Sequence, residues 1–211
     1  GNPKQTGEES VEKRFHSEKK TKKTHRPLVG GSDISRYSLT WSGEYIDYGA
    51  WLAEPRMPEW FTGPRILIRE VTAKGKIQAC LTEDDVVFSN SVDCVKLSND
   101  SVSLSFILGV LNSSLMSFYH LNSSPNAFKN TFPKLLVQDI LGFPISRINF
   151  SDPADKADHD RMIRLVEHML ELNKQLASAK TEHEKTALQR QIDATDKQID
   201  QLVYELYGLT E

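Results

Sequence analysis

Residue types that often carry catalysis occur in this sequence, but their spacing does not assemble an active site. Asp155 and Lys156 follow Pro153 and have the composition of a nuclease carboxylate–lysine pair. Helix initiation explains them better, because proline suits the first helical turn and acidic side chains suit its positive end. The histidines never fall at metal-ligand spacing, and they are His16, His25, His120, His159, His168 and His183. The spacing therefore predicts neither a metal site nor a hydrolytic centre.

Sequence motifs for cofactors are missing as well. The chain has no Walker loop, no G-x-G-x-x-G, no G-x-S-x-G and no methyltransferase signature of Asn or Asp followed by Pro-Pro and an aromatic residue. Cys80 and Cys94 are too few for a disulfide scaffold or a four-thiolate zinc site, and we expect two buried thiols of a cytoplasmic protein. The sequence thus predicts no enzymatic activity and no cofactor in this chain.

Composition is that of a folded, somewhat polar domain. The 211 residues are 38% hydrophobic and 26% charged, which suffices for one domain with an appendage. No apolar run approaches the ~20 residues that cross a bilayer, so we expect no membrane partner. The chain opens at Gly1, and no charged-then-apolar leader follows, which indicates a piece of a longer polypeptide that is not secreted.

Charge is distributed unevenly along the chain. Residues 1–26 carry eight basic and four acidic side chains, residues 152–211 carry eight and thirteen, and the whole chain has a net charge of −3. Residues 1–26 read as a polar lead-in. Their basic run at residues 19–23 has two interpretations, a solvated linker or a phosphate-contacting arm.

Strand patterns begin after Pro27. Residues 65–71 and 77–81 are apolar or alternating and are joined by a short link with Gly75, which predicts a β-hairpin. Two further strand candidates follow before residue 98. Apolar residues at spacings of three and four then predict one helix over residues 103–119, with Phe118 on its apolar face and Ser103 as its cap.

The last sixty residues are predicted to be helical. Two heptad-spaced apolar seams are separated by Thr181 and Glu184, which fit a capping box, so we expect an antiparallel hairpin of two helices. The helix histidines should be exposed. Overall the patterns predict an α+β fold with a strand-rich lobe over residues 27–150, containing one or two packed helices, and a helical hairpin over residues 151–211.

Five stretches, in order along the chain, resemble one protein family. They are residues 31–37 (GSDISRY), 65–69 (RILIR), 107–113 (ILGVLNS), 132–134 (FPK) and 199–209 (IDQLVYELYGL). They are similar to motifs of the TaqI-like C-terminal specificity domain, the target-recognition part of N6-adenine DNA methyltransferases and of fused type IIG restriction-modification enzymes. The resemblance spans roughly residues 27–211.

The resemblance implies a module that recognises a sequence in double-stranded DNA and presents an adenine to a methyltransferase domain upstream in the same polypeptide. That domain would flip the base and bind S-adenosylmethionine. The motif residues also have a scaffold interpretation, because recognition residues differ between enzymes and tend to lie on loops. In that interpretation Arg36 and Tyr37 only pack and pair, and Asn112 bonds a buried backbone group.

Candidate DNA-binding side chains follow from the resemblance, since recognition needs donors that reach base edges and cations that hold phosphates. Lys74 and Lys76 flank Gly75 at a hairpin tip, where a solvated turn is the alternative. Trp60 either stacks on DNA or anchors the core. The remaining candidates are Asn122, Asn126, Lys129, Asn130 and Lys134 in a second polar region, and Arg36, Arg56 and Arg65 elsewhere in the lobe.

A protein-assembly module is the alternative from another functional class. In it the helical hairpin docks on another subunit or domain, and the lobe only supports it. Recognition predicts that the loop lysines converge on one concave face. Assembly predicts an exposed apolar stripe on the hairpin and no basic face.

Overall fold

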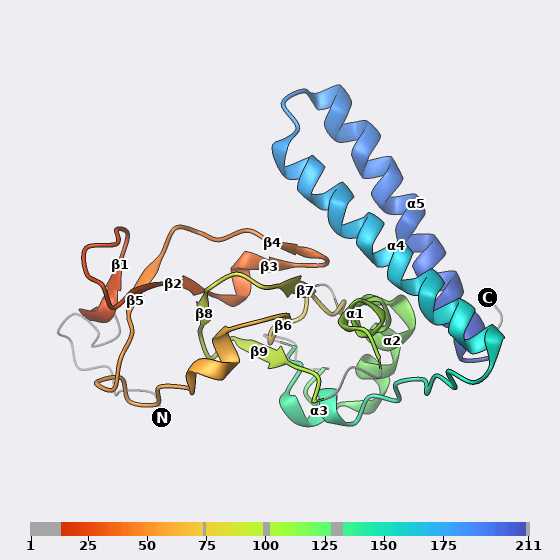
Figure 1. Ribbon diagram of the computed structural model, residues 1–211, viewed down its shortest axis with the longest axis horizontal. Coiled ribbons are helices and arrows are strands. Elements are labelled where there is room, and N and C mark those ends of the chain that lie inside the picture. Colours follow the sequence, from red (N-terminus) through yellow and green to blue (C-terminus); the bar gives the residue numbers. More distant parts are fainter. Residues whose placement is uncertain (1–13, 74, 99–101, 128–132, 210–211) are drawn as a thin grey trace.

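Short strands and long helices occupy different parts of the chain, which gives the α+β fold that the sequence predicts (Figure 1). The computed structural model describes residues 14–73, 75–98, 102–127 and 133–209. The strands are β1 (His16–Ser17), β2 (His25–Val29), β3 (Ile34–Ser35), β4 (Ser38–Leu39), β5 (Tyr45–Asp47), β6 (Arg65–Arg69), β7 (Ala79–Thr82), β8 (Val87–Phe88) and β9 (Val92–Val95). The helices are α1 (Leu104–Asn112), α2 (Ser114–Ser123), α3 (Val137–Leu141), α4 (Pro153–Ser178) and α5 (Glu182–Leu206), with short 3-10 helices η2 (Gly31–Asp33) and η3 (Pro58–Phe61).

The strands form three small sheets. One has the order β1-β5-β2-β8, with β2 antiparallel to β5 and parallel to β8. β3 pairs with β4, and β6 lies between β7 and β9 in an antiparallel sheet. The predicted hairpin is β6 with β7, where Leu67 lies opposite Cys80. β1 and the start of β2 come from the polar lead-in, so the first sheet begins before residue 27.

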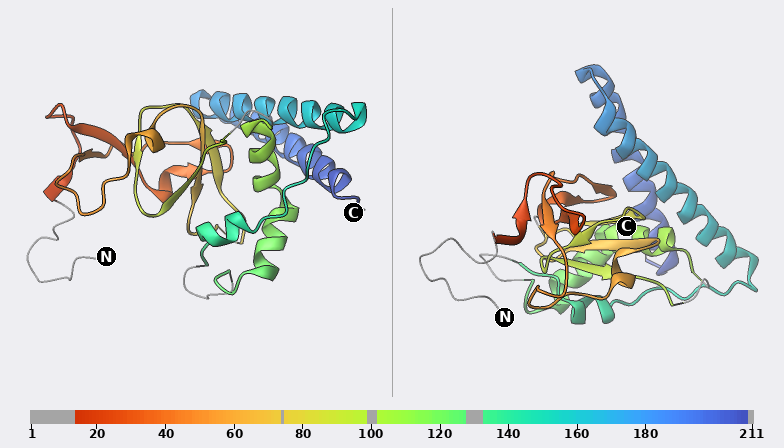
Figure 2. Two further views of the ribbon diagram at one scale, coloured as in Figure 1. Left: turned by 60° about the horizontal axis from the view of Figure 1, so that its bottom comes forward. Right: turned by 60° about the vertical axis from the view of Figure 1, so that its left-hand side comes forward.

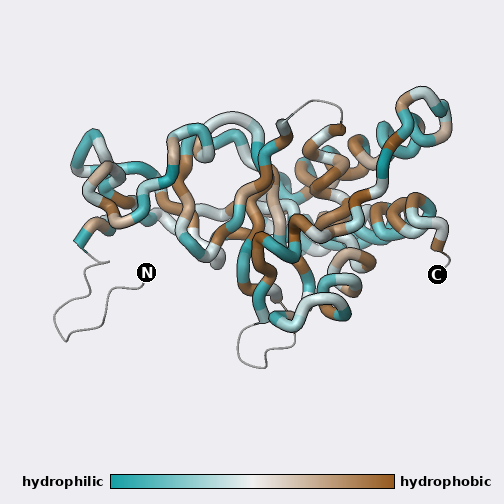
Figure 3. The backbone as a smooth tube through the Cα atoms, turned by 90° about the horizontal axis from the view of Figure 1, so that it is seen from below, coloured by the Kyte–Doolittle hydropathy of each residue, from teal (hydrophilic) through white to brown (hydrophobic). Residues whose placement is uncertain are grey.

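β6 separates two hydrophobic clusters, because neighbouring side chains of a strand point to opposite faces. Ile66 and Ile68 pack in the larger cluster with α1, α4 and α5, while Leu67 packs in the smaller one with Val29 and Phe61. Figure 3 shows hydrophobic positions gathered in the middle of the molecule. The larger cluster contains lobe and hairpin residues together, so the base of the hairpin shares the core of the lobe.

The helix expected over residues 103–119 is divided into α1 and α2, which meet at an angle of 63°. The Ser113 hydroxyl donates to the Val110 carbonyl at 2.7 Å and accepts from the Met116 nitrogen at 3.1 Å, so it ends one helix and starts the next. The predicted cap at Ser103 is confirmed. Phe118 is 64% exposed, because the turn at Ser113 changes which face of α2 is covered.

The helical hairpin forms as predicted, and one of its ends packs on the lobe (Figures 1 and 2). The Thr181 hydroxyl accepts from the Glu184 nitrogen at 3.2 Å, and the Glu184 carboxylate accepts from the Thr181 nitrogen at 3.1 Å, which confirms the capping box. α4 approaches α1 closely at Gly109, where a Cβ atom would lie 2.5 Å from the Met162 sulfur. The end that carries Thr181 projects away from the lobe.

One of the helix histidines departs from the expected exposure. His159 is only 7% exposed, and its ring centroid lies 5.2 Å from that of Phe106 and 5.0 Å from that of Phe150. These partners come from α1 and from the segment before α4, so the periodicity of α4 alone could not show them. His168 and His183 are exposed, as expected.

The described residues also show how the apolar helices and the two cysteines stand. No single helix among them has the length and apolar character needed to cross a membrane, and α1 with α2 meets both criteria only as a bent pair. Cys80 and Cys94 are free thiols, and burial raises the pKa of Cys80 to about 12. The Cys80 thiol is therefore protonated at neutral pH and unreactive.

Candidate nucleic-acid interface

Four of the predicted DNA-binding residues lie on adjoining segments of the lobe. Lys76 follows the tight turn after β6, and its backbone pairs with that of Ala73. Asn122 belongs to the last turn of α2, and Asn126 and Lys134 lie between α2 and α3. We call Lys76, Asn122, Asn126 and Lys134 the turn surface. Lys74, Lys129 and Asn130 lie outside the described residues.

Backbone contacts hold the segments of the turn surface together. Gly75 has a φ of 74°, and a Cβ atom there would lie 3.0 Å from Leu121 of α2, so the turn packs directly on this helix. The Lys134 nitrogen donates to the Asn126 carbonyl at 3.2 Å, and Lys134 also pairs with Val71 just after β6. One set of contacting segments therefore carries all four side chains.

The side chains of the turn surface differ in how far the fold already uses them. Lys76 is exposed, and Asn122 is exposed while its Nδ2 donates to the Phe118 carbonyl at 2.7 Å. Asn126 is half-buried. Lys76 is thus the most accessible cation of the set, and Asn122 offers its amide oxygen as an acceptor.

Lys134 is partly neutralised by a carboxylate. Its Nζ lies 2.8 Å from Glu70 Oε1, with the lysine side chain 41% and the glutamate 20% exposed. Burial, and then the charge of Glu70, raises the pKa of Asp93. Acidic groups therefore border the turn surface on the side of Lys134, and this lysine is a weaker phosphate contact than Lys76.

Arg65 is a structural residue, which corrects its assignment as a DNA contact. Its side chain is fully buried, and its guanidinium donates to the carbonyls of Gly63 at 2.9 Å and Asp84 at 2.6 Å. Burial also lowers its pKa. The guanidinium joins the segment before β6 to the loop after β7, at the end of the pair where Arg65 lies opposite Thr82, so it has no surface to offer a duplex.

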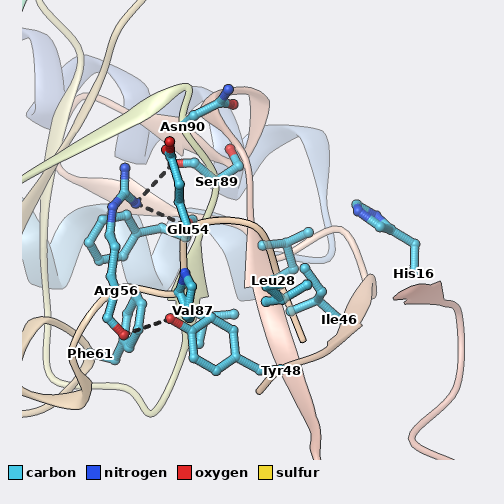
Figure 4. Close-up of a pocket in the computed structure, with 13 residues that line it drawn as sticks. His16, Leu28, Ile46, Tyr48, Glu54, Arg56, Phe61, Val87, Ser89 and Asn90 are labelled. Carbon is cyan, nitrogen blue, oxygen red and sulfur yellow. Dashed lines mark hydrogen bonds between the residues drawn. The ribbon is translucent and has the colours of Figure 1, made fainter. Parts of the chain in front are cut away.

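Arg56 lines an open cavity of about 610 Å³ (Figure 4). Arg56 donates to the carbonyls of Phe88 at 3.1 Å and Ser89 at 3.3 Å, and its guanidinium lies 4.7 Å from the Phe88 ring centroid. Trp60 is 40% exposed, so its ring is accessible and does not anchor the core. The floor of the cavity is apolar, with Leu28, Ile46, Tyr48 and Phe61.

Sequence reasoning missed the polar rim of this cavity. Glu54, Ser89 and Asn90 line it together with Arg56. The Ser-Asn-Ser run at residues 89–91 signals a turn, but no local signal brings that turn opposite residues 54–56. The hydrogen bonds from Arg56 to the Phe88 and Ser89 carbonyls join the two segments.

Arg36 joins the lobe to the hairpin, as its scaffold interpretation predicts. Its Nη1 and Nη2 donate to the two carboxylate oxygens of Asp196 on α5 at 2.8 and 2.5 Å, and Nη2 also donates to the Asn112 carbonyl at 2.7 Å. Burial lowers the pKa of Arg36, but the hydrogen bond and charge of Asp196 outweigh it and leave the pKa raised. This use in the fold corrects the assignment of Arg36 as a DNA contact.

The other motif residues also serve the fold. The Asn112 amide accepts from the Ala79 nitrogen at 3.1 Å and donates to the Ala79 carbonyl at 2.9 Å, so it does bond a buried backbone group. Beside it, the Ser114 hydroxyl donates to Asp200 of α5 at 2.7 Å. Arg36, Asn112 and Ser114 therefore build the joint between the lobe and the hairpin.

Comparison with known proteins adds a family and a fold. Residues 26–145 match the family described as the TaqI-like C-terminal specificity domain. No curated protein sequence matches the chain. Among solved structures the chain is similar to the type IIL restriction-modification enzyme MmeI, which was solved in complex with DNA, with a TM-score of 0.60 and 15% sequence identity.

The two matches differ in what they show. The structural match covers 90% of this chain but 29% of MmeI, so this chain spans under a third of the length of that enzyme and shares a fold with that part. The family match covers more than half of this chain and includes its RILIR and ILGVLNS stretches. The protein therefore belongs to the family of TaqI-like C-terminal specificity domains.

Proposed function

We propose that this chain is the target-recognition module of a restriction-modification enzyme that methylates adenine at N6. The module binds a specific sequence in double-stranded DNA and presents the adenine to a methyltransferase domain upstream in the same polypeptide. The family match over residues 26–145 carries the proposal. Methyl transfer and S-adenosylmethionine belong to the upstream domain, since the sequence of this chain has no motif for either.

The turn surface supplies the chemistry for recognition. Lys76 is an exposed cation that suits a phosphate or the O6 and N7 acceptors of guanine, and the amides of Asn122 and Asn126 suit adenine. Contacting segments fix the backbone positions of these side chains. A preorganised surface binds DNA with a smaller entropy cost than a free loop. Lys74, Lys129 and Asn130 belong to the same proposal through their sequence positions beside it.

Charge limits the affinity of the isolated module. Each neutralised phosphate contributes roughly −0.9 to the slope of log affinity against log salt concentration. Four engaged lysines in this region, Lys74, Lys76, Lys129 and Lys134, would contribute about −3 to −4 to that slope, which is shallow for a specific binder. The upstream domain then contributes much of the affinity, and both act on DNA in the cytoplasm.

The protein-assembly alternative has less support. It requires an exposed apolar stripe on the hairpin, but none of the large hydrophobic side chains that are exposed in the described residues belongs to α4 or α5. The heptad residues near the base pack on the lobe, and those near the tip pack between the two helices.

Selection and titration with DNA test the proposal. A pool of randomised duplexes is selected on the 211-residue chain, and fluorescence anisotropy then compares the selected duplex with a scrambled one. If Lys76 reads a base, K76A weakens binding to the selected duplex by roughly 1–3 kcal/mol and changes binding to the scrambled duplex little. K156A is the matched control, because Lys156 is an exposed lysine of α4. Failure to enrich any sequence, or equal effects of both variants, would contradict the proposal.

A further inference from the structure

Residues 17–24, the last residue of β1 and the loop that leads to β2, are folded against the first sheet. His25 is buried, and its Nδ1 lies 3.1 Å from the Lys19 carbonyl oxygen and 3.3 Å from the Thr21 nitrogen. Lys22 Nζ lies 2.5 Å from Asp47 Oδ2, and this contact lowers the pKa of Asp47. We call residues 17–24 the basic loop. These contacts give the basic loop a defined position on the first sheet.

The contacts that fold the basic loop leave three of its cations unused. Lys19, Lys20 and Lys23 are exposed, and none of them forms an ion pair within the part of the chain that the structure describes. The nearby acidic groups already have partners, since Asp47 pairs with Lys22 and Glu44 lies 2.5 Å from His16 Nδ1. Glu18 is the single acidic residue of the loop.

The composition of the basic loop indicates the kind of partner that it fits. Residues 17–24 read SEKKTKKT and contain no apolar side chain, so the loop cannot bury a hydrophobic surface. Three like charges within five residues repel one another unless a polyanion lies against them. DNA carries one charge per ≈ 1.7 Å of helix axis, and hydroxyl groups such as that of Thr21 can also donate to phosphates.

We propose that the basic loop is a second DNA-contacting surface, which binds the phosphate backbone beside the recognition sequence through Lys19, Lys20 and Lys23. This inference rests on the proposed function and adds to it a sequence-independent contact at a defined place. Figures 1 and 2 show β1 and the basic loop at the end of the lobe away from the hairpin. Because the loop lies at one end, it reaches flanking DNA on only one side of the recognition sequence.

Two variants with the same change in charge separate the basic loop from a general effect. The first is K19Q/K20Q/K23Q. The control is K174Q/K180Q/K197Q, which removes three exposed lysines from the helical hairpin. Both are compared with the unmodified 211-residue chain by anisotropy titration on the selected and scrambled duplexes over a range of salt, and circular dichroism checks that each remains folded.

The expected result is a change of slope in the loop variant only. Engagement of all seven lysines gives a slope of about −6, and loss of the loop lysines returns it to about −3 to −4. Between about 50 and about 200 mM salt, the unmodified chain then loses about 40-fold more affinity than the loop variant. The loop variant loses affinity for the selected and the scrambled duplex by the same factor, because phosphates carry no sequence information.

Duplex length gives an independent readout. Lengthening the selected duplex on one side should tighten binding of the unmodified chain, lengthening the other side should not, and the loop variant should respond to neither. Selective binding with equal slopes for the loop and control variants would overturn the inference and leave the proposed function standing. Absence of selective binding by the unmodified chain would instead refute the proposed function, and this inference would fail with it.

Discussion

The base and the tip of the helical hairpin share one heptad pattern but are held differently. At the base, Met162, Val166 and Ile199 are fully buried because α1 and the lobe cover them. Toward the tip, Leu176 and Leu188 are only half-buried, because the other helix is their sole cover. The same periodicity thus yields a core at one end and a solvent-exposed two-helix rod at the other.

Polar side chains show the same contrast. Arg36 donates to both carboxylate oxygens of Asp196 and to the Asn112 carbonyl, so each of the two charges has a partner of opposite sign within the fold. Lys76 in the turn surface and Lys20 in the basic loop have no such partner among the described residues. A charge that the fold neutralises is less available to a ligand, so the unpaired cations mark where DNA binding should first be sought.

The largest expected effect distinguishes base from tip directly. M162A should lower the free energy of unfolding by about 2–5 kcal/mol, because it opens a cavity between α4 and α1. L188A should lower the free energy of unfolding by about 1 kcal/mol or less, because the Leu188 side chain is only half-buried in the folded protein. Urea unfolding of both variants measures the difference. Equal losses would mean that the tip is as well packed as the base.

Removal of Arg36 tests the polar part of the joint. R36A should lower the free energy of unfolding by about 1–3 kcal/mol, because it leaves the largely buried Asp196 without its two hydrogen bonds. The control is R161A, whose ion pair with Glu205 is 44% exposed on both sides and should contribute less than about 1 kcal/mol. A double-mutant cycle of R36A with D196A isolates the coupling. A coupling energy no greater than that of R161A with E205A would show that hydrophobic packing, and not the Arg36–Asp196 ion pair, holds the hairpin on the lobe.

Loss of the cap at the tip should have a local effect. T181A removes the hydroxyl that accepts from Glu184, which costs typically about 1 kcal/mol. Amide hydrogen exchange should therefore speed up around residues 181–185 while the base remains protected. T181S keeps the hydroxyl and should restore the protection. Faster exchange throughout α5 would contradict the independence of tip and base.

The smallest expected effect is a dependence of stability on pH in the lobe. His120 of α2 is fully buried, and burial lowers its pKa below the ordinary value of about 6.5. The folded state therefore favours the neutral ring, whose stabilisation is present above about pH 6.5 and declines as the pH falls below it. Urea unfolding at pH 7.5 and 5.5 should show the decline, and H120Q should reduce it. If H120Q loses the same stability between pH 7.5 and 5.5 as the unmodified chain, other titratable groups cause the loss.

Several elements were predictable because their signals are local. The capping box at Thr181 and Glu184, the Ser103 cap and the β6–β7 pair each depend on residues close together in the sequence. Heptad spacing likewise fixes which face of α4 and α5 is apolar, whatever that face packs against.

Tertiary structure decided which polar residues remain available. Arg65 and Arg56 lie on either side of η3 and have the same chemistry, yet one is buried and the other lines an open cavity. The basic loop becomes a folded surface only because His25 and Asp47 come together when β2 pairs with β5. Composition and spacing alone determined the α+β class, the hairpin and the family motifs. Long-range pairing determined which charges are neutralised, because ion pairs and burial depend on residues that the sequence holds far apart.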